Sequence, residues 1–202
     1  MIMNRKDILD AFKAIVSENK FSDNYSVFVP IIEVNNELHA LYEVRSLALN
    51  QQPGEVCFPG GKIEPNESPI QSAIRETVEE LNISKENIEI IGELKPITTL
   101  FDVVIYPFCG FIKNIKIEDI NYSRDEVDSI FSVPIKELLN QNPLVHQIGI
   151  KLDIAKDFPH DLIGKDYKWK VSKYPVYFYE YKNHVIWGLT AKITKNFLDI
   201  IK

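Results

Sequence analysis

The sequence predicts a mixed α/β fold with at least one sizeable β-sheet. Segments rich in β-branched and aromatic residues recur along the chain, as strands require. Segments with helical spacing of apolar residues interrupt them. The 202 residues are 45% hydrophobic and 26% charged, the composition of a folded globular protein. Strands interrupted by helices indicate a mixed architecture, and the length favours a single domain spanning residues 1–202.

The N-terminal part of the chain predicts a helix followed by a β-hairpin. Residues 1–20 carry apolar side chains at helical spacing with acids between them, a pattern that a signal or transit peptide lacks. Residues 26–34 and 38–45 have strand composition, and Asn35-Asn36 between them supplies a turn. A Pro-Gly-Gly cluster at 59–61 then marks a bend before a helix.

The remainder of the chain predicts more strands and two more helices. A short helix fits 134–139, and a longer one fits 188–201. The segment 155–175 is the least regular and is expected to form a long loop. Five further strands are expected, at 88–97, 103–112, 127–133, 144–152 and 176–181.

The helix after the glycines has clearly signalled ends. Ser68 is a good N-cap, Pro69 suits the first helical position, and Asn82 suits a left-handed C-terminal position. One narrow stripe is predicted to pack on the sheet, formed by Ile70, Ile74, Thr77 and Leu81. Three glutamates fall together on roughly the opposite side, namely Glu76, Glu79 and Glu80.

Charge and cysteine content exclude several classes of function. The formal net charge is −6 and the pI about 5.3, so the chain lacks the basic footprint of nucleic-acid or anionic-membrane binding. Two cysteines without zinc-site spacing support neither a disulfide framework nor a zinc site. The longest apolar stretch is too short to cross a bilayer. We therefore expect a cytoplasmic protein.

The glutamate cluster has two interpretations. It is either a solvated acidic face or a site for a hard cation such as Mg²⁺, which takes oxygen ligands and leaves positions for water and substrate phosphates. Like charges three and four residues apart repel in an isolated helix. Glu67 is spaced from Arg75 so that an ion pair can fix the preceding loop on the helix. This context favours the cation site.

The segment 58–83 resembles the Nudix box, in which a glycine, five residues, a glutamate and seven residues precede R-E-U-x-E-E-x-G-U, where U is bulky and aliphatic. Thr77 and Asn82 depart from the pattern, at an aliphatic and a glycine position. Seven positions fit in register, namely Gly61, Glu67, Arg75, Glu76, Glu79, Glu80 and Ile83.

The resemblance implies a Nudix-type α/β/α sandwich with a mixed central sheet and hydrolysis of a nucleoside diphosphate linked to another moiety. It implies that Glu76, Glu79 and Glu80, with the Gly61 carbonyl nearby, hold Mg²⁺ or Mn²⁺ and that Arg75 braces Glu67. Glu79 is our first candidate for the base, and Glu76 shares the catalytic role. Glu126 either supplies a further catalytic acid or is a surface acid before a strand.

The segment 41–61 resembles the signature of coenzyme A pyrophosphatases, L-L-T-x-R-[SA], three residues, R, three residues, G, three residues, F-P-G-G. Tyr42, Glu43 and Asn50 depart from it, and Asn50 stands where an arginine is expected. Eight positions match without a gap, namely Leu41, Arg45, Ser46, Gly54, Phe58, Pro59, Gly60 and Gly61.

The resemblance makes coenzyme A, or an acyl derivative, the expected substrate. Arg45 and Lys62 are the candidate phosphate ligands, although each also suits a solvated surface role. Two alternatives stay open: hydrolysis of another nucleotide such as ADP-ribose, NADH or a dinucleoside polyphosphate, and a catalytically silent nucleotide-binding module. We expect a small-molecule nucleotide as partner, no nucleic acid, no membrane and a possible homodimer.

Overall fold

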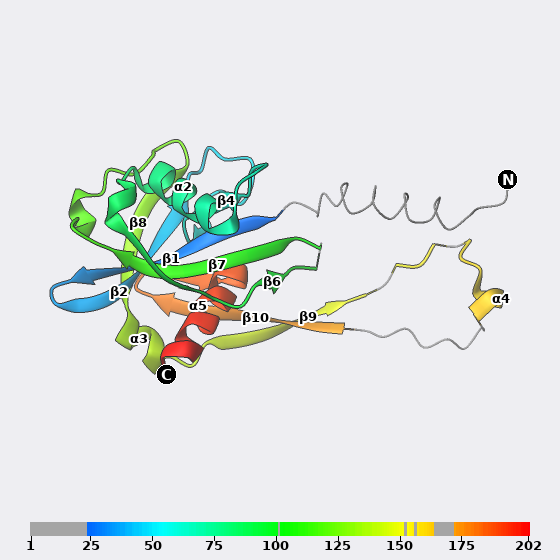
Figure 1. The fold of residues 1–202 in the computed structure, drawn as a ribbon. Coiled ribbons are helices and arrows are strands. Elements are labelled where there is room, and N and C mark those ends of the chain that lie inside the picture. Colours follow the sequence, from blue (N-terminus) through cyan, green and yellow to red (C-terminus); the bar gives the residue numbers. More distant parts are fainter. Residues whose placement is uncertain (1–23, 101, 152, 156, 164–171) are drawn as a thin grey trace.

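A mixed β-sheet forms the centre of the computed structural model, which describes residues 24–100, 102–151, 153–155, 157–163 and 172–202 (Figure 1). In spatial order its main path is β3 (Val56–Cys57), β2 (Glu37–Arg45), β1 (Tyr25–Val34), β7 (Val104–Ile112) and β5 (Ile88–Glu93). Three added strands, β4 (Gly60–Lys62), β6 (Ile97–Thr98) and β8 (Val127–Pro134), pair with β1, β7 and β2, respectively. Strand β1 runs parallel to β7, and the other pairs of this sheet are antiparallel.

A second, smaller sheet adjoins the first. It consists of β9 (Leu144–Ile150), β10 (Ser172–Tyr181) and β11 (His184–Trp187), all antiparallel. The helices are α2 (Pro69–Leu81), α3 (Ile135–Asn140), α4 (His160–Ile163) and α5 (Gly188–Ile201), and the short 3₁₀ turns are η1 (Lys85–Asn87) and η2 (Ile117–Asp119). None of the helices within the described ranges has the length and hydropathy needed to cross a bilayer.

The two faces of the central sheet carry separate hydrophobic cores. Successive strand residues point to opposite faces, so Phe28 packs with Ala73 of α2, whereas Val29 packs with Ile193 of α5. The Tyr42 hydroxyl joins the α5 face to the sheet through a 3.1 Å hydrogen bond with Thr194 Oγ1. Figure 1 shows α2 and α5 on opposite sides of the sheet. The predicted α/β/α sandwich with a mixed central sheet is therefore confirmed.

The signalled ends of the predicted elements are found where expected. Asn35 and Asn36 both have positive φ, 52° and 62°, and form the turn of the first hairpin. Helix α2 begins after a Ser68–Gln71 capping box and ends at Asn82, whose φ is 52°. The helix predicted at 188–201 has those bounds. The helix predicted at 1–20 lies outside the described residues.

Several predicted segments differ in extent. The strand predicted at 88–97 divides into β5 and β6, because Pro96 between them has no N–H to donate to the ladder. β10 begins at Ser172 and α4 lies earlier in the same region, so the loop predicted at 155–175 is too long. β11 was not predicted; its four residues are too few for a clear alternation of apolar and polar side chains.

Candidate active site

A cavity of about 600 Å³ lies where α2, α5 and the strands between them meet. Its lining is chemically mixed. It carries most of the sequence-predicted residues and also includes the apolar side chains Val103, Ile105 and Leu189, together with Trp187. The predicted residues that line it are Arg45, Gly61, Lys62, Glu76, Glu80 and Glu126.

Three predicted residues, Glu67, Arg75 and Glu79, lie outside the cavity lining. Arg75 binds Glu67 with both arms of its guanidinium: Nε donates to Oε1 at 2.9 Å and Nη2 donates to Oε2 at 3.0 Å. These hydrogen bonds hold the pKa of Glu67 below its usual range. Nη2 also donates to the Lys62 carbonyl at 3.2 Å. The predicted ion pair therefore forms and ties the loop before α2 to the helix.

Arg75 also holds two glutamates of its own helix. Its Nη1 donates to Glu76 Oε1 at 2.8 Å and to Glu79 Oε2 at 3.1 Å. Glu79 nevertheless keeps a side chain that is 55% exposed. Burial raises the pKa of Glu76, and the neighbouring Arg75 offsets part of that rise. The guanidinium thus draws Glu79 to the outer side of the helix.

The glycines before α2 bring backbone close to the helix carboxylates. A side chain at Gly60, which has a φ of 155°, would collide with the Ser26 carbonyl. The Gly60 N–H donates to Glu80 Oε2 at 2.8 Å. A Cβ at Gly61 would collide with the carboxylate of Glu76. Only glycine fits against the backbone at Gly60, whereas a side chain at Gly61 would displace the Glu76 carboxylate.

Glu80 is buried, although helical spacing places it with Glu76 and Glu79 on roughly the side opposite the stripe predicted to pack on the sheet. It is 6% exposed, and its pKa is raised to about 8, chiefly by burial. The carboxylates of Glu76 and Glu126 contribute to this rise, whereas the hydrogen bond from the Gly60 N–H opposes it. Ile70, predicted to face the sheet, is 38% exposed instead. Helical periodicity predicts which side of a helix packs on the sheet but not where along the helix the burial begins. In α2 the first buried residues are Ser72 and Ala73, C-terminal to Ile70.

Arg45, Lys62 and Glu126 reach the cavity from three different segments. Arg45 ends β2, and its backbone N–H donates to the Glu55 carbonyl at 2.9 Å. The next residue, Ser46, donates from its N–H to the Glu126 carbonyl at 2.8 Å, which fixes the loop that carries Glu126 beside β2. Lys62 ends β4 and is exposed. The fold thus gathers both predicted cations and three predicted acids around one cavity.

Glu43 is an acidic residue near this site that the sequence did not single out for a role. It lies on β2 between Leu41 and Arg45, and its side chain is 1% exposed. Burial raises its pKa well above the usual range, and the nearby Glu80 carboxylate raises it further. The signal available in the sequence was an acid within an otherwise apolar or aromatic run, residues 40–44.

The residues fit a divalent cation by their chemistry. Among the described residues no three acidic, histidine or cysteine side chains already converge as ligands. Two of the box glutamates are bound by Arg75 instead. Even so, several carboxylates share a buried region, raise one another's pKa values, and leave Glu43 Oε1 without a hydrogen-bond partner there. Oxygen-rich, negatively charged sites of this kind suit Mg²⁺ or Mn²⁺.

Comparison with known proteins points to one family. A family model described as NUDIX domain matches residues 25–151. The chain is 30% identical over 190 residues to Nudix hydrolase 3 of Caenorhabditis elegans, covering 93% of this chain and 77% of that protein. It is 30% identical over 177 residues to the peroxisomal coenzyme A diphosphatase NUDT7 of Mus musculus, covering 85% and 67%.

A solved structure supports the fold independently. The MutT/nudix family protein from Enterococcus faecalis superposes with a TM-score of 0.51 at 15% sequence identity, covering 100% of this chain and 76% of that one. At this identity the likeness concerns the fold alone. The family match therefore comes from the sequence, and the structure agrees with it.

Proposed function

This chain belongs to the Nudix hydrolase family, and on that premise we propose that it hydrolyses the pyrophosphate bond of coenzyme A or an acyl-coenzyme A. The products are 3′,5′-ADP and 4′-phosphopantetheine, or its acyl form. The cavity that holds acids, cations and an apolar wall together carries this proposal. The similarity to a coenzyme A diphosphatase supports this choice of substrate.

The box glutamates form the acidic part of the proposed site. Nudix hydrolases in general use divalent metal ions; here Glu76 and Glu80, with the Gly61 carbonyl, would be the main ligands of Mg²⁺ or Mn²⁺, and the more exposed Glu79 would be a peripheral one. When bound, such an ion neutralises phosphate charge and lowers the pKa of a coordinated water. The Gly60 N–H orients the Glu80 carboxylate for this role.

The remaining polar residues bind and orient the substrate. We assign Arg45 and Lys62 to the phosphates, because both line the cavity and an acidic protein needs local cations for an anionic substrate. Glu126 takes the proton from the attacking water. It lines the cavity with Glu76 and Glu80, whereas Glu79 is 55% exposed and lies outside the cavity lining. Glu79 stays the alternative base.

The apolar region of the cavity supports a substrate with an extended non-nucleotide part. The partly buried Val103 and Leu189 offer apolar surface that a small, fully charged nucleotide would leave uncovered. We assign this region to the pantetheine arm or its acyl group.

Because β1 and α5, near opposite ends of the described chain, line the same cavity, we also propose that the chain forms one domain.

The test is incubation of the purified protein with coenzyme A and either Mg²⁺ or Mn²⁺, with products separated by chromatography. ADP-ribose, NADH and a dinucleoside polyphosphate serve as parallel substrates. We expect 3′,5′-ADP from coenzyme A at a higher kcat/KM than any product from the others. Rapid turnover of ADP-ribose or NADH without 3′,5′-ADP would replace coenzyme A with that nucleotide. No turnover of any of them would favour a silent binding module.

A further inference from the structure

Glu43 combines burial with an unsatisfied oxygen. Its side chain is 1% exposed, and within the part of the chain that the structure describes its Oε1 has no hydrogen-bond partner. An ionised carboxylate without a partner is costly to bury, so such groups are usually paired or coordinate metal. A residue kept only for packing at this position would be apolar. The side chain therefore requires a partner that the described protein atoms do not provide.

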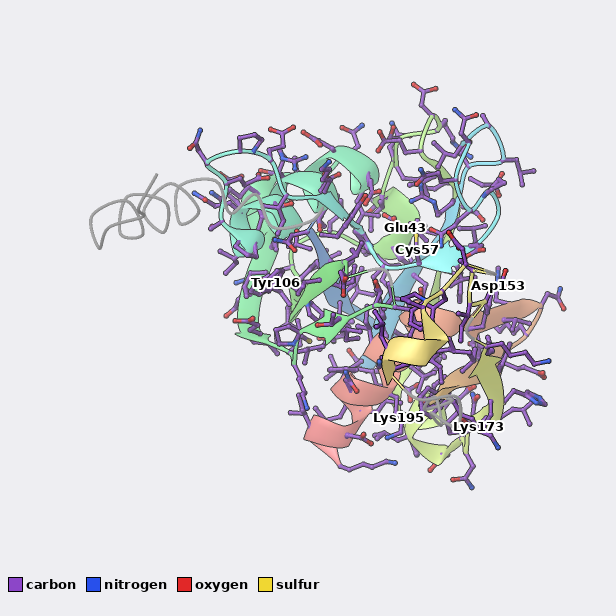
Figure 2. The ribbon with its side chains drawn as sticks, turned by 90° about the vertical axis from the view of Figure 1, so that its right-hand side faces the viewer. Glu43, Cys57, Tyr106, Asp153, Lys173 and Lys195 are labelled. Atoms are coloured by element: carbon purple, nitrogen blue, oxygen red, sulfur yellow. The ribbon has the colours of Figure 1, made fainter. Side chains whose placement is uncertain are left out.

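The position of Glu43 in the sheet turns it toward the candidate site. It stands opposite Cys57 of β3, and Cys57 lines the cavity (Figure 2). Side chains directly opposite in an antiparallel pair share one face, and alternation along β2 places Arg45 on that face too. Burial, together with the Glu43 and Glu80 carboxylates, raises the pKa of the Cys57 thiol. Glu43 therefore lies next to residues that line the cavity.

The charged groups near Glu43 leave its charge uncompensated. Glu80 and Glu126 face it with negative charge, and Arg45 is the cation that acts on it. Arg45 Nε donates to the Gln51 carbonyl at 3.4 Å, and the Arg45 side chain also hydrogen-bonds to the Cys57 thiol. Arg75 is engaged by Glu67, Glu76 and Glu79. A further cation between Glu43 and Glu80 would remove the excess of negative charge.

We propose that Glu43 is a further carboxylate of the divalent-cation site, acting with Glu80 on the same bound ion. The inference rests on the metal site of the proposed function and adds a ligand group from β2, outside the Nudix box. The coenzyme A pyrophosphatase signature has threonine at this position. Glu43 would therefore give this chain a higher cation affinity than a chain with that threonine. The expected consequence is tighter cation binding in the absence of any substrate.

The test is a Mn²⁺ titration of the metal-free protein, with free Mn²⁺ measured by electron paramagnetic resonance and no nucleotide present. E43Q keeps the shape of the side chain and removes its charge, and E43T introduces the residue of the signature. E37Q, at an exposed glutamate on the same strand, is the matched control. We expect the Kd for Mn²⁺ to rise about 10- to 100-fold in E43Q and E43T and to stay within twofold in E37Q.

Stability separates this role from a structural one. E43Q removes a buried acid whose ionisation is opposed by burial and by the neighbouring Glu80, so its melting temperature in EDTA should equal or exceed that of the wild type, while its gain on adding Mn²⁺ should shrink. Wild-type Mn²⁺ affinity in both Glu43 variants, or no Mn²⁺ binding by the wild type, would overturn the inference. Because no substrate is present, a wild type that binds Mn²⁺ through Glu43 but leaves coenzyme A intact contradicts only the proposed substrate.

Discussion

Arg75 divides the acidic side chains around α2 into two groups with opposite electrostatic balance. The outer group, Glu67 and Glu79, accepts hydrogen bonds from its guanidinium. Glu76 accepts one as well but lines the cavity, and burial raises its pKa, so it lies between the two groups. The inner group contains the buried Glu43 and Glu80, whose pKa values are raised. The negative charge of the outer group is thus compensated by Arg75, whereas that of the inner group needs a cation from solution.

This difference between the two groups of acids indicates that the Nudix box has both a structural and a chemical role. An ion pair formed with a bidentate arginine fixes the loop and the helix before any metal binds. Buried acids with raised pKa values mark functional positions more often than structural ones. We therefore expect inner-group substitutions to damage activity more than stability, and substitutions in the Arg75 clamp to affect both.

The largest effect is expected from E80Q. The glutamine oxygen can still accept the Gly60 N–H, but the charge that would bind the cation is lost. We expect kcat/KM for coenzyme A to fall on the order of 10³-fold, roughly 4 kcal/mol of transition-state stabilisation. Melting in EDTA should show no loss of stability. Activity within tenfold of the wild type would remove Glu80 from the proposed cation site.

A smaller loss is expected from E126Q, compared directly with E79Q. Glu126 lines the cavity, so loss of its carboxylate should lower kcat about 10²-fold and flatten the acidic limb of the pH–rate profile. Glu79 is held by Arg75 on the outer side, and E79Q should cost about tenfold or less. A larger loss and an altered pH profile in E79Q would instead make Glu79 the base, as the sequence suggested.

R75K tests the outer group. Lysine keeps the charge but cannot make the two parallel hydrogen bonds to Glu67. We expect a loss of about 1–2 kcal/mol in the free energy of unfolding by urea and roughly a tenfold fall in kcat/KM. R124K, at an exposed arginine, is the control and should match the wild type. A fully active and stable R75K would show that the clamp is dispensable.

Local signals in the sequence predicted the mixed α/β class and the ends of α2, whereas the sandwich was predicted from the resemblance to the Nudix box. Ser68 and Asn82 act through their own backbone neighbours, and the Glu67–Arg75 spacing spans one loop and two turns. The burial of Glu80 depends on how closely α2 packs against the loop at Gly60, which no local sequence pattern encodes. The burial of Glu43 depends on its pairing with Cys57 of β3. Both properties arise from tertiary packing.

The smallest predicted effect is on the pH dependence of stability without metal. The pKa of Glu80 rises from 4.5 to about 8 on folding, so the folded state holds a proton that the unfolded state has lost between these values. The free energy of unfolding in EDTA should therefore fall as pH rises through this window and level off above about pH 8. Glu43 and Glu76, whose pKa values are also raised, act in the same direction.

Urea unfolding at several pH values between 5 and 8 measures this slope, and E80Q should reduce it. Glu67 has the opposite sign, since its lowered pKa adds stability that is lost only as pH falls below the ordinary value of 4.5. Saturating Mn²⁺ should also reduce the slope, because the cation competes with protons for the same carboxylates. Stability that rises from pH 5 to 8 in EDTA would mean that the inner acids are compensated in the metal-free protein, and the contrast between the two groups would then be lost.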